Sequence, residues 1–417
     1  MADQKNSARP GRVSLTVGLG VIVMSYWVMC YFYPGWMFAI GINHFDKWFI
    51  DTSVILASND AVSFGLDPYQ PNPLDYLHRP HVYSHWWLHL RDLGLTRADA
   101  NWVGLGLAGM FLVMALWRLR PHGPRQFFWY AAVLGSSPVL LAVERGNNDL
   151  VIFILLAPLV TCLRDARRVA QGCALCLLAL AAALKYYPAA AGLLLLAAVE
   201  ARQLRGWCFI MLPLLAYVAI AAAGDLAGLG ALAPPPEGLM SFGATAFFNV
   251  IGWTGWVPKL LVAAIGLGVV IYFWFTRVLQ DWEPAPEESS DWLHFVLGAV
   301  LLAGCFFTNM NFDYRWIFAI WLAPLLWDLS HPADQASPVG RLARTTRWLL
   351  LAALWWGPFA CLLLNRLTGV VPHSTVMRWA TWFFMAEQPL VWALFVCLLA
   401  FLTHFVRVRI RALSCHG

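Results

Sequence analysis

The chain has 417 residues, of which 60% are hydrophobic and only 12% are charged, and its mean hydropathy is +0.63. Soluble domains carry about 25% charged residues, so this composition excludes a soluble globular protein and predicts an all-α polytopic membrane protein. The formal net charge of +5 identifies no partner, because membrane proteins collect Lys and Arg on one side, and we expect no nucleic acid to bind.

Apolar runs bounded by charge or proline predict about twelve transmembrane helices. The predicted spans are 13–40, 99–117, 126–142, 150–163, 171–184, 188–200, 207–223, 258–276, 292–307, 316–329, 347–364 and 388–405. The first run is too long for the core of a cleaved signal peptide, so we expect it to be retained as a span. The runs 150–163, 171–184 and 188–200 are short and are expected to be broken, tilted or buried within the bundle.

The positive-inside rule fixes the expected orientation. With the N-terminus (1–12) and the C-terminal tail (406–417) in the cytoplasm, most of the 28 Lys and Arg fall inside. Three outer loops follow, 41–98, 224–257 and 365–387, and the first is very large. We therefore predict a single membrane domain, 1–417, in the plasma (inner) membrane, with its functional machinery on the extracytoplasmic side.

One lysine interrupts the apolar stretch "LALAAALKYYPAAAGLLLL" at 177–195. A charge at the centre of a membrane helix costs about 3 kcal/mol. The charge count of the later loops favours two short helices that meet at Tyr187-Pro188 over one kinked helix. Lys185 is then expected at a helix break near the outer surface.

Four polar stretches lie at predicted outer ends of spans, so one outward cavity could collect them. They are "HFDKWFIDTSVILASNDAVSFGLDPY" (44–69), "VERGNNDL" (143–150), "LKYYP" (184–188) and "TNMNFDYRW" (308–316). Together they supply the carboxylates of Asp46, Asp51, Glu144, Asp149 and Asp313 and the cations of Arg145, Lys185 and Arg315. A carboxylate can take the proton of an attacking hydroxyl, and cations can stabilise an anionic leaving group. A lipid-phosphate-linked sugar is a substrate that needs both.

Each stretch also has a purely structural interpretation. Asp46 and Asp51 could be solvated loop acids; five residues apart on a helix, they would point in different directions. Glu144-Arg145 and Asp149 could form salt bridges that cap two helices. Lys185 could extend to the lipid head groups, and Asp313 could pair with Arg315.

Four histidines at positions 78, 81, 85 and 89 lie in "LHRPHVYSHWWLHL". Their spacing would place them along one face of a helix. The interleaved Trp and Leu favour an amphipathic helix lying on the bilayer surface, and a metal site is the alternative. We expect no cofactor and no metal ligands, although a divalent ion remains possible.

The same stretches resemble a known family. "DTSVILASNDAVSFGLDPY" (51–69), "ERGNNDLVIFILL" (144–156), "ALKYYPAAAGLLLL" (183–196) and "NFDYRW" (311–316) are similar, in order and sidedness, to stretches of glycosyltransferase family 87. This family of bacterial polyprenyl-phosphate-dependent mannosyl- and hexosyltransferases belongs to the GT-C superfamily. The resemblance extends from the first span to about residue 330, and the last two spans match only in character.

The resemblance implies a GT-C bundle and an inverting transfer of mannose, or of another hexose or pentose, from a polyprenyl-phosphate donor to a hydroxyl of a lipid or glycan acceptor. It implies that Asp51 is the catalytic base, with Asp46 as the alternative. It implies donor-phosphate contacts from Lys185 and, more loosely, from other cations and a tyrosine. The proposed phosphate contacts are Lys185, Arg315, Arg145 and Tyr187, and the further site-lining residues are His44, Asn148, Asp149, Asp313 and Tyr314.

Other functions remain open at this point. A secondary transporter would also have about twelve spans with both termini inside. Against it, the sequence shows no repeated halves, and its polar residues gather at outer ends rather than at the bilayer midplane. Another lipid-processing transferase, or a scaffold or lipid-carrier protein of the cell envelope, would likewise interact with membrane lipids.

Overall fold

The computed structural model describes residues 10–42, 44–165, 167–198, 216–217, 219–220, 238–280, 282, 289–308, 310–330, 337–368 and 370–415. Most of the predicted span 207–223 lies outside these residues, as do 224–237 of the predicted second outer loop.

The described chain is almost entirely helical, with α-helices, short 3-10 helices (η) and one pair of two-residue strands. In chain order the elements are α1 (Pro10–Phe32), α2 (Pro34–Ala39), α3 (Ile50–Ser63), η1 (His85–Leu93), η2 (Arg97–Asp99), α4 (Ala100–Arg118), α5 (Pro124–Leu134), α6 (Ser137–Arg145), α7 (Asn148–Leu156), α8 (Leu159–Arg164), α9 (Arg168–Leu184), η3 (Tyr187–Leu194), α10 (Leu195–Ala198), η4 (Gly238–Met240), β1 (Ser241–Phe242), α12 (Ala246–Val250), α13 (Trp256–Thr276), α14 (Ser289–Thr308), β2 (Asn311–Phe312), η5 (Asp313–Trp321), α15 (Ala323–Leu329), α16 (Pro338–Leu367) and α17 (His373–Cys415).

Six of the described helices are long and apolar enough to cross a membrane. They lie in α1, α4, α13, α14, α16 and α17, and α5 with α6 forms a seventh candidate that is bent by 49°. The all-α membrane class is therefore confirmed. The predicted spans 150–163, 188–200 and 316–329 correspond instead to pairs of short helical segments, α7 with α8, η3 with α10 and η5 with α15, and 171–184 corresponds to the single helix α9 of 17 residues.

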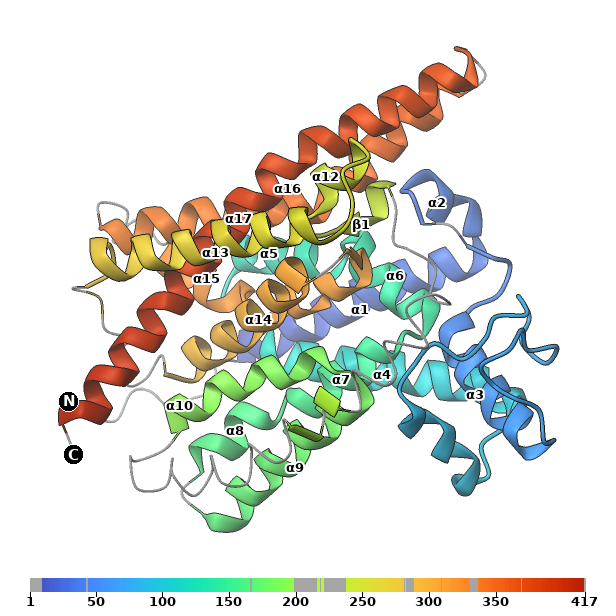
Figure 1. Cartoon of the computed structure of the whole chain (residues 1–417), viewed down its shortest axis with the longest axis horizontal. Helices are drawn as coiled ribbons and strands as arrows, with labels where there is room; N and C mark the ends of the chain where they lie inside the picture. Colours follow the sequence, from blue (N-terminus) through green and yellow to red (C-terminus); the bar gives the residue numbers. More distant parts are fainter. Residues whose placement is uncertain are drawn as a thin grey trace.

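The helices run roughly along one axis, so the bundle has two ends (Figure 1). α16 and α17 lie side by side for much of their length, and α13 and α14 both pack against α17. α3, η1 and η2 gather at one end of the bundle, where α3 contacts α4 and α6. α17 ends at the opposite end (Figure 1). The end that carries α3 holds most of the predicted polar stretches.

The predicted helix break at Lys185 is confirmed. α9 ends at Leu184, and Lys185 has an extended backbone (φ −150°, ψ 129°) before Tyr187 begins η3. Pro188 has no N–H to continue a helical ladder, and it stands at the start of η3, where that loss is tolerated. The chain therefore turns at Lys185 and presents its side chain to α7 rather than leaving it within an unbroken apolar helix.

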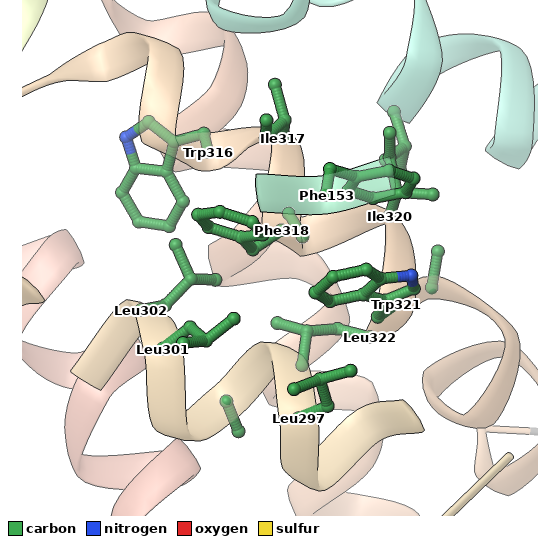
Figure 2. Packing of buried hydrophobic residues seen from close by; sticks show 14 of the residues in the cluster. Phe153, Leu297, Leu301, Leu302, Trp316, Ile317, Phe318, Ile320, Trp321 and Leu322 are labelled. Atoms are coloured by element: carbon green, nitrogen blue, oxygen red, sulfur yellow. The ribbon is translucent and has the colours of Figure 1, made fainter. Parts of the chain in front are cut away.

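Aromatic packing between η5, α7 and α14 forms the centre of the bundle. Figure 2 shows Trp316, Phe318 and Trp321 of η5 lying over the leucines of α14, with Phe153 of α7 beside them. The rings of Phe153 and Trp321 are stacked at 4.4 Å with an angle of 10° between their planes. Gly298 lets η5 approach α14, because a Cβ there would lie 2.7 Å from the carbonyl oxygen of Phe318. Such close packing holds η5 rigidly and fixes the polar residues at its first turn.

One loop prediction is corrected by the structure. The predicted third outer loop, 365–387, is mostly helix, because α16 continues to Leu367 and α17 already begins at His373. The two helices lie side by side (Figure 1) and continue past the ends of their apolar runs. In the second outer loop, β1 pairs antiparallel with β2, with Ser241 opposite Phe312.

The prediction of one helical face of histidines is wrong. η1 begins only at His85, after an N-cap at Ser84, so the segment that holds His78 and His81 is not helical. His78 adopts a positive φ of 53°, and His81 is fully buried. The sequence contains Pro80 between them, which disfavours a helical conformation at the preceding residue. η1 packs on α3 and on the end of α9.

Candidate functional site

Asp51 lies in the first turn of α3, where the helix dipole favours a negative charge. The residue is only 8% exposed. One carboxylate oxygen, Oδ2, accepts a hydrogen bond of 2.7 Å from Nδ2 of Asn147. The other, Oδ1, lies 3.3 Å from Nη1 of Arg79. The carboxylate is therefore held in one orientation from two sides, at the end of the bundle where α3 meets α6.

The start of α3 is fixed by contacts with the turn that follows α6. The backbone N–H of Phe49 donates to the carbonyl of Glu144 at 2.7 Å, and Oγ1 of Thr52 donates to the carbonyl of Gly146 at 2.7 Å. Phe49, the N-cap of α3, has a left-handed backbone (φ 57°, ψ 37°). Its ring lies against Gly104 of α4, where a Cβ would be only 2.1 Å away. These contacts place Asp51 relative to both α4 and α6.

Gly146 is the residue of this turn that tolerates substitution least. It ends α6 in the left-handed region (φ 56°, ψ 41°), and a Cβ there would lie 2.5 Å from Oγ1 of Thr52 and 3.1 Å from Cβ of Phe49. We expect Gly146→Ala to lower the free energy of unfolding by about 1–3 kcal/mol, from left-handed strain and this overlap.

Thermal unfolding followed by tryptophan fluorescence measures the effect of Gly146→Ala. Gly172→Ala is the matched control, because Gly172 lies inside α9 with no atom within 4 Å of its Cβ position. Alanine is a better helix former than glycine there, so the control should unfold at the same or a slightly higher temperature. Equal losses of stability in both variants would contradict the assigned role of Gly146.

A second group of charges surrounds Asp149, which is completely buried in the first turn of α7. Nζ of Lys185 and the hydroxyl of Tyr187 both donate to Oδ1, the latter at 2.6 Å. Nε of Arg315 lies 3.7 Å from Oδ2. The guanidinium of Arg315 also stacks over the ring of Tyr187 at 4.9 Å, and Nζ of Lys185 lies 5.5 Å from the ring centre of Tyr314. With two cations and one carboxylate, this group carries a formal charge of +1.

Asn147 joins the two groups. Its Nδ2 donates to Asp51, and its Oδ1 accepts from the backbone N–H of Asp149 at 2.9 Å, which caps α7. The structure thus brings Asp51 and Lys185 to the same end of the bundle. They are linked through Asn147 and through the ion pair of Asp149 with Lys185. The hydroxyl of Tyr83 interacts electrostatically with the carboxylates of both groups, Asp51 and Asp149. Burial raises the pKa of this hydroxyl well above the ordinary value, and the negative charges of Asp51 and Asp149 add to that rise.

Arg79 also belongs to the site, although no motif predicted it. Its guanidinium contacts Asp51, donates from Nη2 to the carbonyl of Ile50 at 2.7 Å, and donates from Nε to Asp75 at 3.0 Å. Burial lowers the pKa of Arg79, but the hydrogen bond to Asp75 and the charges of Asp75 and Asp51 outweigh it, and the net pKa is raised. The side chain holds the loop after α3 against the beginning of that helix.

We expect Arg79→Ala to destabilise the protein by about 3 kcal/mol, because it leaves the buried carboxylate of Asp75 without its cation. Arg97→Ala is the control. Arg97 pairs with Asp60 at 3.8 Å and its side chain is 50% exposed, so its loss should cost less than about 1 kcal/mol. Denaturant titration of both variants in detergent measures the difference, and similar midpoints would rule out a special role for Arg79.

Three of the predicted site residues form a separate group beside Asp51. His44 Nδ1 lies 2.7 Å from Oε1 of Glu144, and Nε of Arg145 lies 3.2 Å from Oε2 of the same carboxylate. The guanidinium of Arg145 also covers the ring of Phe45 at 4.6 Å. Arg145 is thus engaged by Glu144 and Phe45.

The remaining predicted residues differ in their surroundings. Asp46 is exposed, has a positive φ of 55°, and lies at the mouth of a groove between α1 and α4. Asp313 is buried at the first turn of η5. Asn148 is buried next to the two charged groups, and neither polar atom of its side chain has a hydrogen-bond partner among the described residues.

Within the described ranges, no three His, Cys, Asp or Glu residues converge in a way that could hold a metal ion. Two residues of the site, Arg79 and Asn147, were missed by sequence reasoning. Asn147 lies inside the stretch "VERGNNDL", so its neighbours pointed to it, whereas Arg79 is an isolated cation in a long loop. No protein-family model, curated protein or solved structure matches the chain.

Proposed function

We propose that the protein is an inverting membrane glycosyltransferase of the GT-C type, resembling glycosyltransferase family 87. It moves a hexose or pentose from a polyprenyl-phosphate donor to a hydroxyl of a lipid or glycan acceptor on the extracytoplasmic side. The observation that carries the proposal is the arrangement of Asp51 beside the group of Lys185, Asp149 and Arg315, joined by Asn147. A base and an excess positive charge then lie at one end of a membrane bundle.

Asp51 fits the part of general base. One of its carboxylate oxygens accepts from Asn147 and the other faces Arg79, and these two fixed partners leave lone pairs for an incoming hydroxyl. As the acceptor oxygen attacks the anomeric carbon, Asp51 takes the proton from that oxygen. The glycosidic bond to the phosphate oxygen breaks at the same time, and its electron pair leaves with the polyprenyl phosphate. Attack from the face opposite the phosphate inverts the anomeric centre.

Lys185 and Arg315 fit the part of phosphate binders. Both are close to Asp149, which neutralises only one of the two charges. The remaining positive charge stabilises the phosphate as negative charge develops on it. Tyr187 adds a hydroxyl that now donates to Asp149. The carrier's tail would lie in the bilayer beside the broken helices α9 and η3, at the level of Lys185.

The direct test uses the purified protein in lipid nanodiscs with labelled polyprenyl-phosphate mannose, glucose or a pentose, and with lipid extract as the acceptor. We expect transfer of label from one donor, release of polyprenyl phosphate in equal amount, and an inverted linkage. No transfer from any donor, together with sugar uptake by proteoliposomes under an ion gradient, would refute the proposal in favour of a transporter.

A further inference from the structure

A groove of about 750 Å³ lies between α1 and α4, separate from the charges around Asp149. On α1 it is lined by Met24, Val28 and Phe32, which are four residues apart and so share one helical face. On α4 it is lined by Leu105 and Gly109, again four residues apart. Both helices are long and apolar enough to span a membrane, so the groove is an apolar channel at the level of the lipid chains.

The dimensions of the groove suit a hydrocarbon chain. From Met24 to Phe32 the helix rises about 12 Å at 1.5 Å per residue, which is most of one leaflet of a hydrocarbon core about 30 Å thick. Gly109 makes the groove deeper, because it has no side chain and no other atom lies within 4 Å of the position where its Cβ would be. The groove therefore has room for a chain without any rearrangement of α1 or α4.

One end of the groove meets the segment that leads into α3. Asp46, Lys47, Trp48 and Phe49 line this end, and Asp51 follows two residues later. Lys47 donates from Nζ to Oγ of Ser53 at 2.8 Å. Asp46 and Phe49 both have left-handed backbones, a costly conformation for residues with side chains that is found preferentially at functional sites. This end of the groove is therefore formed by the residues that lead directly into the first turn of α3, which carries Asp51.

We propose that this groove binds the hydrocarbon chain of a lipid acceptor and directs the hydroxyl of its uncharged head group toward Asp51. This inference rests on the proposed function. The charges favour an acceptor over the donor, because the end of the groove carries one anion and one cation, Asp46 and Lys47, whereas the group around Asp149 has the excess positive charge that a phosphate needs. Inversion also requires the acceptor and the phosphate on opposite faces of the sugar.

The experiment fills the groove with a side chain. Gly109→Phe puts a ring into the groove, and Gly106→Phe is the matched control. Gly106 lies on the same helix, also has no atom within 4 Å of its Cβ position, and does not line the groove. Each variant, in nanodiscs, is irradiated with diacylglycerol that carries a photoreactive diazirine in one acyl chain, and the labelled peptides are identified by mass spectrometry.

We expect label on residues 24–32 and 101–109 of the unaltered protein, at least a tenfold loss of it in Gly109→Phe, and no change in Gly106→Phe. In the transfer assay, Gly109→Phe should raise the KM for a lipid acceptor at least tenfold and leave the KM for the donor unchanged. If Gly109→Phe fails the size-exclusion test for folding, Gly109→Leu takes its place.

Three results would overturn the inference. These are equal labelling of both variants, stronger labelling of the groove by diazirine-bearing polyprenyl phosphate, and equal labelling by diazirine-bearing phosphatidylcholine, which has no free hydroxyl. Asp51→Asn separates this failure from that of the proposed function. If it abolishes transfer while Gly109→Phe has no effect, only the groove assignment fails. If Asp51→Asn transfers sugar normally, only the assignment of the base to Asp51 fails, and if the unaltered protein transfers no sugar from any donor, the proposed function fails whatever the groove binds.

Discussion

Replacing Asp51 by asparagine should lower the rate of sugar transfer by about 10²–10⁴-fold, the usual contribution of a general base, without unfolding the protein. The amide has the same shape as the carboxylate, and its oxygen can still accept the hydrogen bond that Asn147 now donates at 2.7 Å. The change thus removes the capacity to take a proton and keeps the packing. Single-turnover transfer with saturating donor and acceptor measures the chemical step directly.

Asp46→Asn is the matched control for Asp51→Asn. Asp46 is exposed at the mouth of the α1–α4 groove, so its loss should leave the rate of the chemical step within about threefold of the unaltered enzyme, well below the contribution of a base. An inactive Asp46→Asn together with an active Asp51→Asn would assign the base to Asp46. If both variants are active, neither carboxylate is the general base.

Replacing Lys185 by methionine should have two separable effects. Asp149 is completely buried, and losing the cation that donates to it should cost about 3 kcal/mol of stability, as for other buried ion pairs that lose one partner. Loss of the excess positive charge should also raise the KM for the polyprenyl-phosphate donor at least about tenfold, which corresponds to about 1.4 kcal/mol of binding.

A second substitution separates the two effects of Lys185→Met. Adding Asp149→Asn removes the buried carboxylate and returns the group to a formal charge of +1, carried by Arg315. The double variant should therefore recover most of the lost stability, and a KM for the donor that stays raised would assign the loss of affinity to the phosphate contact of Lys185 itself rather than to the net charge. Lys259→Met is the control, because Lys259 is exposed at the start of α13 and its loss should change neither quantity. Normal donor kinetics in Lys185→Met would show that the lysine serves only to neutralise Asp149.

The sequence predicted those features that depend on local composition. The apolar runs of α1, α4, α13, α14, α16 and α17 identify membrane helices, and the charge and proline at 185–188 identify a helix break, because burying a lone lysine in an unbroken apolar helix is costly. The four polar stretches were expected to share one end of the bundle, and the structure brings residues of all four together around Asp51 and Asp149.

The remaining features depend on contacts between distant segments. Arg79 reaches Asp51 from a loop that has no periodicity, so nothing in its neighbourhood marks it. The spacing of the histidines suggested one helical face, but the helix begins only at His85, after its N-cap at Ser84, so His78 and His81 lie outside it. α16 and α17 continue through most of 365–387, past the ends of their apolar runs, and a hydropathy pattern alone does not predict that extension.

The contact between Phe49 and Gly104 makes two positions in different helical segments depend on each other. A methyl group at Gly104 would overlap the ring of Phe49, which caps the helix that carries Asp51. A larger residue at position 104 is therefore tolerated only together with a smaller residue at position 49. Among sequences descended from a common ancestor, the two positions should therefore vary as a compensating pair, and such paired variation would reveal this contact without any coordinates.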